Sequence, residues 1–496
     1  MRQHWAIDRK YTGRSVDERF YPKANANLGP HSIFGTYTTL AAKNSLCCYG
    51  AASTMALHRV VCRHSSRAWQ RLSCSVSVPA RPQPPPTLAP ARPFSSLMTR
   101  LGLARRPRSA PRTMPTTGFD AIAHEQLVEE EDMPEYRAEH FYPVRLGEFF
   151  HDRFQTVAKL GYGSSSTIWL ARDLQDHQYV ALKVYIHNSL QHRELPFYEH
   201  LDNVLPSRHP GAKNIRKLLG SFQVAGPHGT HMVLVLQVSQ MSIRDMDTVF
   251  MNGRGFDEIF VKGAIKELLR GLDFLHSKVQ CVHTDVHPGN LLLGADDDSI
   301  FQQLEEAEFK NPVPRKQVGD RTIYLSRLMK PKVGPLLLSD FGEARLGPGP
   351  HAGDIMPIMY RAPETLLHIQ WSYAVDIWSV GLTAWDLLQG RTLFSARKDD
   401  GSFSDGVHLA ELIAALGPPP QQLLDRHRAR ALKYWDEQGN WGDFVPIPTE
   451  KTLEATETKL NENRTLFLSF IRRALTWDPD ARPTARELLR DPWLVI

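Results

Sequence analysis

Two short segments of the sequence combine polar side chains with apolar flanks in a pattern that suits phosphoryl chemistry. The first reads HTDVHPGN at 283–290 and is followed by three leucines, and the second reads DFG at 340–342 after LLLS. An aspartate on such a loop can accept the proton of an attacking hydroxyl group, and carboxylate and amide oxygens are ligands that Mg²⁺ prefers. We therefore predict a site of phosphoryl transfer in which Asp285 is the base and Asn290 and Asp340 are metal ligands.

A glycine-rich segment and a lysine in an apolar strand precede these loops. The segment reads LGYGSSSTI at 160–168, and its glycines would let a hairpin tip approach a phosphate closely, although two such glycines are more often a simple turn. Lys183 lies in VALKV at 180–184, where its charge needs a partner. Nucleotide phosphates are one partner and Glu194, in a predicted helix, is another; a strand lysine that extends to solvent is the bland interpretation.

The hydrophobic pattern predicts the elements that must position these residues. From Arg153 onward apolar residues alternate between Gly and Asp turns, which indicates an antiparallel sheet. Beyond Asp257 the period becomes that of a helix, and further helices are predicted around 375–388, 409–416 and 466–475. The first helical face is predicted to contain Ile259, Ala264, Leu268, Leu272 and Leu275. A strand-rich front and a helix-rich back predict two lobes with a cleft between them.

The net charge of +5 divides unevenly along the chain. Residues 1–119 contain 18 Lys and Arg against three acidic residues, and residues 120–496 contain 41 basic against 51 acidic residues, a net charge of −10. We therefore interpret 1–119 as a basic, disordered or transit-like leader and 120–152 as an acidic extension, and we expect no direct binding of nucleic acid. No apolar run is long enough to span a membrane, and four of the five cysteines lie in the leader, which disfavours a disulfide framework.

The order of these motifs resembles that of the eukaryotic protein kinase family. YRAPE at 360–364 is similar to the motif that closes the activation segment, DIWSVG at 376–381 to the buried central helix of the large lobe, and Arg482 to the arginine that pairs with Glu364. The resemblance covers residues 153–496. It implies an α+β, bilobal protein kinase-like fold, with an antiparallel sheet and helix C in an N-lobe at 153–238 and a larger, mainly helical C-lobe at 239–496.

The resemblance also implies ATP and Mg²⁺ as cofactors and assigns the site residues. The catalytic set is Asp285, Lys183, Glu194 and His287, and the metal ligands are Asn290 and Asp340. The residues expected to contact ATP are Gly161, Tyr162, Gly163, Ser164, Ser165, Ser166, Thr167, Ile168, Ala181, Lys183, Leu236, Gln237 and Val238.

Within that family the sequence is most similar to the SR-protein-specific kinases. STIWL at 166–170, VRLGE at 144–148 and HTD in place of HRD carry this likeness, and a polar insert at 294–333, expected to be a loop with a short helix at 301–309, lies where those kinases have their spacer. The likeness implies a serine/threonine kinase for basic or Arg-Ser-rich proteins, with a role in mRNA splicing. It would also imply an acidic docking helix, but the aligned positions are Val407 and Ala414, with Asp405 and Glu411 nearby.

The activation segment lacks the usual phosphorylation sites. Between Asp340 and Glu364 there is no Ser or Thr, and Tyr360 is the one residue that could carry a phosphate. Thr284 also replaces the arginine with which many kinases bind an activation-loop phosphate. Both halves of that switch are missing, so our hypothesis is a constitutively competent kinase.

Three positions depart from the family pattern. His287 replaces the usual phosphate-contacting lysine and, with an ordinary pKa of about 6.5, would be a cation only in part at neutral pH. Pro357 replaces a threonine that often braces the catalytic aspartate. Pro196, two residues after Glu194, predicts a later start or a kink in helix C, because proline inside a helix costs roughly 3 kcal/mol.

Two other functions remain open from the sequence. A pseudokinase is disfavoured because Lys183, Asp285, Asn290 and Asp340 are all present, and an aminoglycoside-type phosphotransferase, suggested by HPGN, is disfavoured by the APE motif, Asp376 and Arg482. For location we expect cytoplasm and nucleus. The alternative is the mitochondrion, because the Arg- and Ser-rich segment from Met55 contains no acidic residue.

Overall fold

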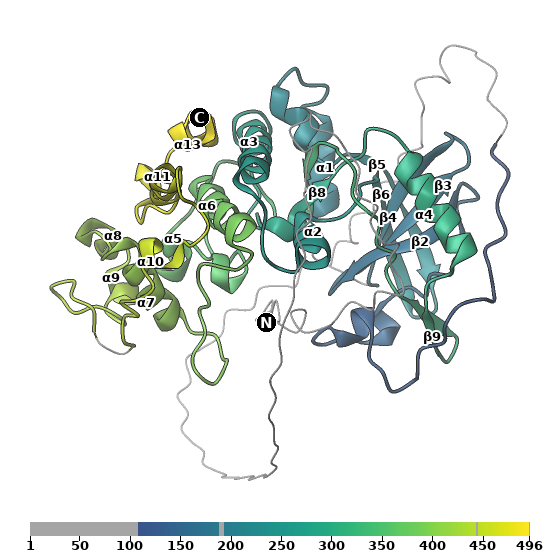
Figure 1. Ribbon diagram of the computed structural model, residues 1–496, viewed down its shortest axis with the longest axis horizontal. Helices are drawn as coiled ribbons and strands as arrows, with labels where there is room; N and C mark the ends of the chain where they lie inside the picture. Colours follow the sequence, from purple (N-terminus) through teal and green to yellow (C-terminus); the bar gives the residue numbers. More distant parts are fainter. Residues whose placement is uncertain (1–107, 188–192, 443–444, 496) are drawn as a thin grey trace, which may run out of the picture.

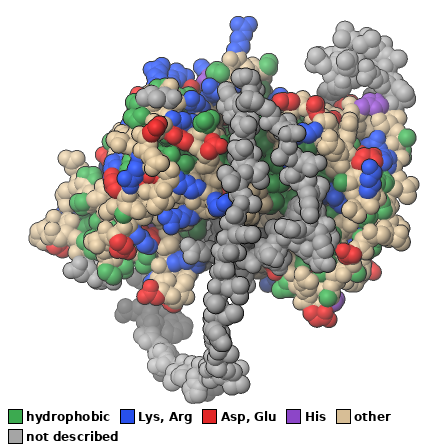
Figure 2. All heavy atoms as spheres, viewed as in Figure 1, with side chains coloured by type: hydrophobic (Ala, Val, Ile, Leu, Met, Phe, Trp, Pro, Cys, Tyr) green, Lys and Arg blue, Asp and Glu red, His purple; other side chains and the backbone are tan. Residues whose placement is uncertain are grey.

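A computed structural model describes residues 108–187, 193–442 and 445–495, which form two lobes side by side (Figure 1). The strands β1 to β6 make up one lobe, and most helices make up the other. The transit-like segment predicted from Met55 lies outside the described residues. Within the described part, no helix is both long and apolar enough to cross a bilayer. Acidic and basic side chains are interspersed on the face that Figure 2 shows.

The N-lobe is built on a six-stranded antiparallel sheet in the order β1-β2-β3-β4-β6-β5. The antiparallel arrangement is the one that the alternating apolar residues predict, and apolar residues of the sheet pack on both of its faces. The strands are β1 (Phe149–Phe150), β2 (Phe154–Gly163), β3 (Ser166–Asp173), β4 (Gln178–Tyr185), β5 (Leu218–Gly226) and β6 (Gly229–Gln237).

Helix α1 (Glu194–Asp202) packs beside the sheet in the position of helix C. It begins at Glu194, so the expectation of a later start is wrong. Pro196 is the third helical residue, in the first turn, where a backbone N–H has no partner within the helix and proline is tolerated.

The C-lobe is organised around two long helices, α3 (Glu258–Phe274) and α6 (Ala374–Gln389). Asp257 caps α3 by accepting a hydrogen bond from the N–H of Phe260, and Gly390, in the left-handed region at φ 68°, ends α6. Around them lie α2 (Ile243–Met246), α5 (Pro363–Leu366), α7 (Asp405–Leu416), α8 (Gln421–Asp425), α9 (Arg428–Ala431), α10 (Leu453–Thr456), α11 (Arg464–Ala474), α12 (Ala485–Leu488) and α13 (Pro492–Val495).

One residue that the sequence analysis assigned to the buried face of α3 does not lie on that face. Ile259 is 70% exposed, whereas Ala264, Leu268 and Leu272 are buried. Ala264 comes five positions after Ile259, and at 3.6 residues per turn a step of five positions turns roughly 140° around the helix axis. The buried face begins instead with Phe260 and Val261.

The HTDVHPGN and DFG segments lie on short antiparallel ladders between the lobes. Strand β7 (Cys281–Val282) precedes the HTDVHPGN segment and pairs with β12 (Arg345–Leu346). Strand β8 (Leu291–Leu293) follows it and pairs with β11 (Leu336–Leu338), which leads into DFG. The leucine runs on either side are therefore the buried strands that the sequence indicated, and they bring two distant loops together.

The insert and the residues before the kinase-like region cover one side of the N-lobe sheet. Helix α4 (Ser299–Lys310) is followed by a hairpin of β9 (Arg315–Val318) and β10 (Arg321–Tyr324). This is more structure than the loop and short helix predicted for 294–333. The predicted end of the leader at 119 is also too late, because Met114 packs with Phe301 and Val157, and the N–H of Arg112 donates to Gln155 at 2.9 Å.

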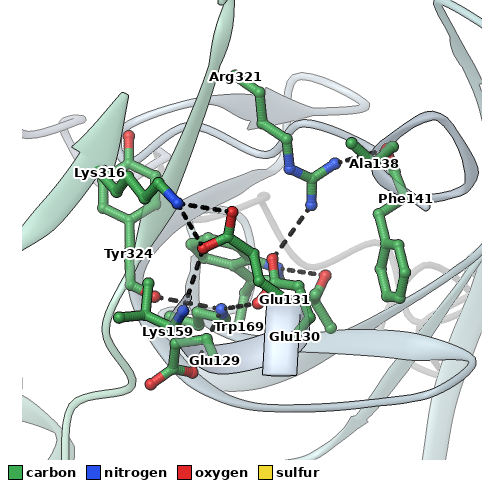
Figure 3. Close-up of polar contacts among 12 residues, drawn as sticks. Glu129, Glu130, Glu131, Ala138, Phe141, Lys159, Trp169, Lys316, Arg321 and Tyr324 are labelled. Carbon is green, nitrogen blue, oxygen red and sulfur yellow. Dashed lines mark hydrogen bonds and ion pairs between the residues drawn. The ribbon is translucent and has the colours of Figure 1, made fainter. Parts of the chain in front are cut away.

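An ionic cluster joins the acidic extension and the insert to β2 (Figure 3). The Nζ of Lys159, 1% exposed, forms ion pairs with Glu130 and, at 3.3 Å, with Glu129, and donates to the carbonyl of Tyr324 at 3.1 Å. Arg321 pairs with Glu130 at 3.1 Å. Burial raises the pKa of Glu130, but the charge and hydrogen bond of Lys159 and the charge of Arg321 together outweigh it and lower that pKa below its usual value. The strand leading into the glycine-rich segment is thus held by two distant parts of the chain.

Candidate active site

A buried carboxylate accepts hydrogen bonds from the backbone of the HTD segment and fixes its position. Asp376, fully buried on α6, accepts hydrogen bonds from the N–H groups of His283 and Thr284, both at 2.8 Å. The ring of His276 contacts the same carboxylate at 2.8 Å. These contacts set the position of the loop before any substrate binds.

Asp285 and Asn290 face each other across this loop. The Nδ2 of Asn290 donates to the carboxylate of Asp285 and to its backbone carbonyl, both at 2.9 Å. Because Nδ2 is used in this way, the Oδ1 of Asn290 is left as an oxygen ligand of the kind that Mg²⁺ prefers. The side chain of Asp285 is 25% exposed, so its carboxylate can be reached by a hydroxyl group.

Lys183 of β4 lies between two carboxylates. Its Nζ is 2.7 Å from Glu194 of α1 and 3.0 Å from Asp340 of the DFG segment. Burial opposes the charge, but Asp340 and Glu194 outweigh it and raise the pKa of Lys183 well above its usual value. The same lysine lowers the pKa of Asp340 against the effect of burial. Lysine and aspartate are therefore both charged at neutral pH, and the pair predicted between Lys183 and Glu194 forms.

Aromatic packing connects DFG to α1 and to the HTD loop. Phe341 stacks on Phe197 with ring centroids 3.9 Å apart, and its edge meets His283. The Nδ1 of His283 accepts from the N–H of Asp285, so its Nε2 donates to the carbonyl of Ser339 at 3.2 Å. The group of Lys183, Glu194 and Asp340 is thus held against the group of Asp285 and Asn290.

The glycine-rich segment forms the hairpin between β2 and β3, with Ser164 and Ser165 at its turn. A Cβ added at Gly161 or Gly163 would meet no described atom within 4 Å. Packing within the described protein therefore does not require glycine at either position. Close approach of a phosphate to the backbone would require it.

The other residues predicted to contact the nucleotide lie where β4 and β6 face the second lobe. Ala181 pairs in register with Leu236, and both are fully buried. Val238 follows at the passage between the lobes. The carbonyl of Gln237 accepts from Nε of Arg216 at 2.9 Å. Tyr162, Ser166, Thr167 and Ile168 belong to the ladder of β2 and β3 around the hairpin.

The predicted ion pair between Glu364 and Arg482 is confirmed. Two nitrogens of the Arg482 guanidinium contact the two carboxylate oxygens of Glu364 at 2.6 and 2.7 Å, and both side chains are fully buried. This bidentate contact fixes the end of the segment that follows DFG.

The sequence as a whole matches known proteins over the same region. A family model described as a protein kinase domain matches residues 154–494. The chain belongs to the protein kinase family. The crystal structure of a kinase domain covers 72% of this chain and 99% of its own, with a TM-score of 0.54 at 22% identity, which supports the fold.

Curated relatives narrow the activity of this kinase. A serine/threonine protein kinase of Aspergillus fumigatus is 40% identical over 396 residues, covering 79% of this chain and 97% of that protein. The serine/threonine-protein kinase SRPK of Physarum polycephalum is 28% identical, covering 74% and 91%. SRSF protein kinase 3 of Mus musculus is 34% identical over 524 residues, covering 74% and 90%. This chain is a serine/threonine protein kinase with SRPK-type relatives.

The activation segment of the kinase is anchored by its own side chains. Glu343, directly after DFG, pairs with Arg193 at the start of α1 at 3.1 Å, and its backbone carbonyl accepts from the hydroxyl of Thr284 at 2.8 Å. Tyr360 is 2% exposed, and its hydroxyl donates to the half-buried Asp386. The one residue of the segment that could carry a phosphate is therefore inside the protein.

Sequence reasoning missed one residue beside the catalytic loop of the kinase. Arg244 of α2 reaches across to His287, with its Nη2 2.9 Å from Nδ1 of that ring. Nothing in the local sequence SIRDM distinguishes this arginine from a surface residue, so the contact could be found only from the structure.

Proposed function

We propose that this kinase transfers the γ-phosphoryl group of MgATP to serine or threonine of basic protein substrates, with Asp285 as the base. Protein kinases in general use ATP and Mg²⁺, and a bound Mg²⁺ supplies neutralisation of phosphate charge. Asn290 and Asp340 would hold the metal ion. Lys183, oriented by Glu194, would bind the phosphates. The observation that carries the proposal is the position of Lys183 between Glu194 and Asp340.

The chemistry assigned to Asp285 follows from its contacts. Asn290 donates to one carboxylate oxygen at 2.9 Å, which fixes the rotamer, while the other oxygen faces the ring of His287 at 3.5 Å. A carboxylate held in this way can accept the proton of a substrate hydroxyl group as the oxygen attacks phosphorus. General-base catalysis typically contributes about 10²- to 10⁴-fold to the rate.

Charge supports basic substrates, but the acidic residues of α7 do not. Residues 120–496 have a net charge of −10. Because the relatives include SRPK-type kinases, we propose Arg-Ser-rich proteins as the class of basic substrate. Glu411, however, is buried and accepts from Ser395 and Lys451. Asp405 pairs with Arg430 at 2.6 Å. Both residues are used within the protein, so the basic substrate would be recognised elsewhere.

The anchored activation segment supports activity without phosphorylation. Glu343 places a negative charge next to Arg193 of α1. In kinases that are activated by phosphorylation, a phosphate group supplies such a charge. Each exposed ion pair of this type is worth only about 0–1 kcal/mol, so the buried contacts of Lys183 and Phe341 must contribute most to the arrangement.

A substrate panel tests the proposal. Transfer from MgATP is measured to an Arg-Ser peptide, to an acidic Ser/Thr peptide of equal length and to an aminoglycoside, with Asp285→Asn as the matched control. We expect transfer to the Arg-Ser peptide to exceed transfer to the acidic one. Transfer to the aminoglycoside alone would favour the small-molecule phosphotransferase, and nucleotide binding without transfer to any acceptor would favour the pseudokinase.

A further inference from the structure

The hydrogen bonds at His287 define its protonation. Its Nδ1 lies 2.9 Å from Nη2 of Arg244 and 3.0 Å from the backbone nitrogen of Gly289. A guanidinium and a backbone N–H are both donors and have no lone pair to offer. Nδ1 must therefore be the acceptor, and the ring is neutral with its proton on Nε2.

This tautomer directs one donor toward the catalytic base. Nε2 lies 3.5 Å from Oδ1 of Asp285, and the ring is 7% exposed, so it stays in this orientation. A neutral histidine cannot supply the positive charge of the lysine that serine/threonine kinases usually carry at this position.

Arg244 is placed to supply that charge. It is partly buried over the catalytic loop, and among the residues that the structure describes no carboxylate lies within ion-pair distance of it. Asp386 feels its charge from further away, but burial raises the pKa of Asp386 to about 7, so this carboxylate offsets the charge of Arg244 only in part. A Cβ at Gly289 would lie 2.8 Å from Nη1 of Arg244, so glycine at this position leaves room for the guanidinium. A partly desolvated cation with no carboxylate in ion-pair contact favours an anion nearby, and the phosphoryl group in transfer is the anion of this site.

We propose that Arg244 is a positioning residue of the phosphoryl-transfer step, acting through His287. It holds His287 as the Nε2-protonated donor beside Asp285 and provides the permanent positive charge that a lysine in place of His287 would bring. The inference rests on the assignment of Asp285 as the base. It adds to the site a residue from α2, outside every motif that the sequence analysis singled out.

A cycle of variants tests the inference. Steady-state kinetics are measured for Arg244→Met, His287→Lys and the double variant, with Arg254→Met, an exposed arginine in the following loop, as the matched control. We expect Arg244→Met to lower kcat about 10- to 100-fold, less than the 10²- to 10³-fold typical of a donor that contacts the reacting oxygen directly. KM for ATP should stay near that of the parent. Arg254→Met should behave as the parent.

The double variant separates this role from a structural one. In His287→Lys alone, the new ammonium group would face the guanidinium of Arg244, and the repulsion between the two cations should lower activity. In the double variant the guanidinium is gone, so the introduced lysine should restore at least part of kcat. The double variant should therefore exceed Arg244→Met in kcat. Gly289→Ala, which displaces the guanidinium, should reproduce the loss seen in Arg244→Met.

Several outcomes would overturn the inference. These are parent-like kcat for Arg244→Met, or no recovery in the double variant when thermal unfolding shows that all variants are folded. Failure of the proposed function looks different, because the parent itself would then transfer no more phosphate than Asp285→Asn.

Discussion

Replacing Lys159 by methionine removes the central cation of the ionic cluster that joins the extension and the insert to β2. Its ammonium group is buried against Glu130, Glu129 and the carbonyl of Tyr324. Methionine fills similar space, so the change leaves buried carboxylates in place and removes a charge rather than volume. Glu130 keeps Arg321 at 3.1 Å as a second partner.

The magnitude follows from this burial. Removing one partner of a buried ion pair costs about 3–5 kcal/mol where the remaining charge is left uncompensated. Because Arg321 still pairs with Glu130, we expect the lower end of this range, about 3 kcal/mol, for Lys159→Met. At about 1.4 kcal/mol per tenfold change, local opening of the extension should become about 10²-fold more frequent. Glu130→Gln should cost less, because Lys159 keeps Glu129 at 3.3 Å.

Hydrogen exchange of the intact kinase measures this opening. The amides of Glu131 and Met133, which donate within the acidic turn, should lose protection in Lys159→Met. Lys310→Met, at an exposed position of α4, is the matched control and should change stability by no more than about 0.5 kcal/mol. Unchanged exchange at both amides in Lys159→Met would refute the reasoning.

The same cluster predicts a dependence on pH. The pKa of Glu130 is lowered in the folded protein, so its carboxylate stabilises the fold fully above the unfolded pKa of about 4.5 and loses this contribution as pH falls through the folded value. The difference in protection between the parent and Lys159→Met should therefore narrow below about pH 4.5. A difference that widened on acidification would contradict the assignment.

Three further changes have defined outcomes. Arg482→Met leaves Glu364 buried without its cation, so the free energy of unfolding from urea titration should fall by about 3–5 kcal/mol, and a loss below about 1 kcal/mol would contradict the account. Gly163→Val should raise KM for ATP about tenfold by displacing the nucleotide while leaving the unfolding midpoint unchanged, since no described atom lies within 4 Å of its Cβ. Phosphatase treatment should leave activity unchanged, because Tyr360 is buried; loss of activity would reveal a phosphate that the kinase requires.

The residues proposed to be catalytic could be singled out from the sequence because their chemistry restricts them to a few side chains in a fixed order. Asp285, Asn290 and Asp340 stand beside leucine runs that could only be buried strands, and the structure brings them together through β8 and β11. The pair of Glu364 and Arg482 was predicted from resemblance across 118 residues and forms as expected.

The ionic cluster around Lys159 could not be predicted in the same way. Glu129 to Asp132 has the composition of a solvated acidic patch, and its burial depends on Lys159 and Arg321, which are 29 and 191 residues from Glu130. Periodicity describes which face of an element is apolar and carries no information on such distant ion pairs. Arg244 was missed for the same reason, because its partner lies 43 residues away on another element.

The central claim is that the kinase transfers phosphate with Asp285 as its base. Single-turnover transfer from MgATP to an Arg-Ser peptide is compared for the parent and Asp285→Asn, with nucleotide binding measured on the same samples. The account predicts unchanged binding and a rate lowered by at least about 10²-fold, which corresponds to roughly 3 kcal/mol in the barrier. Equal rates for the parent and Asp285→Asn would contradict it.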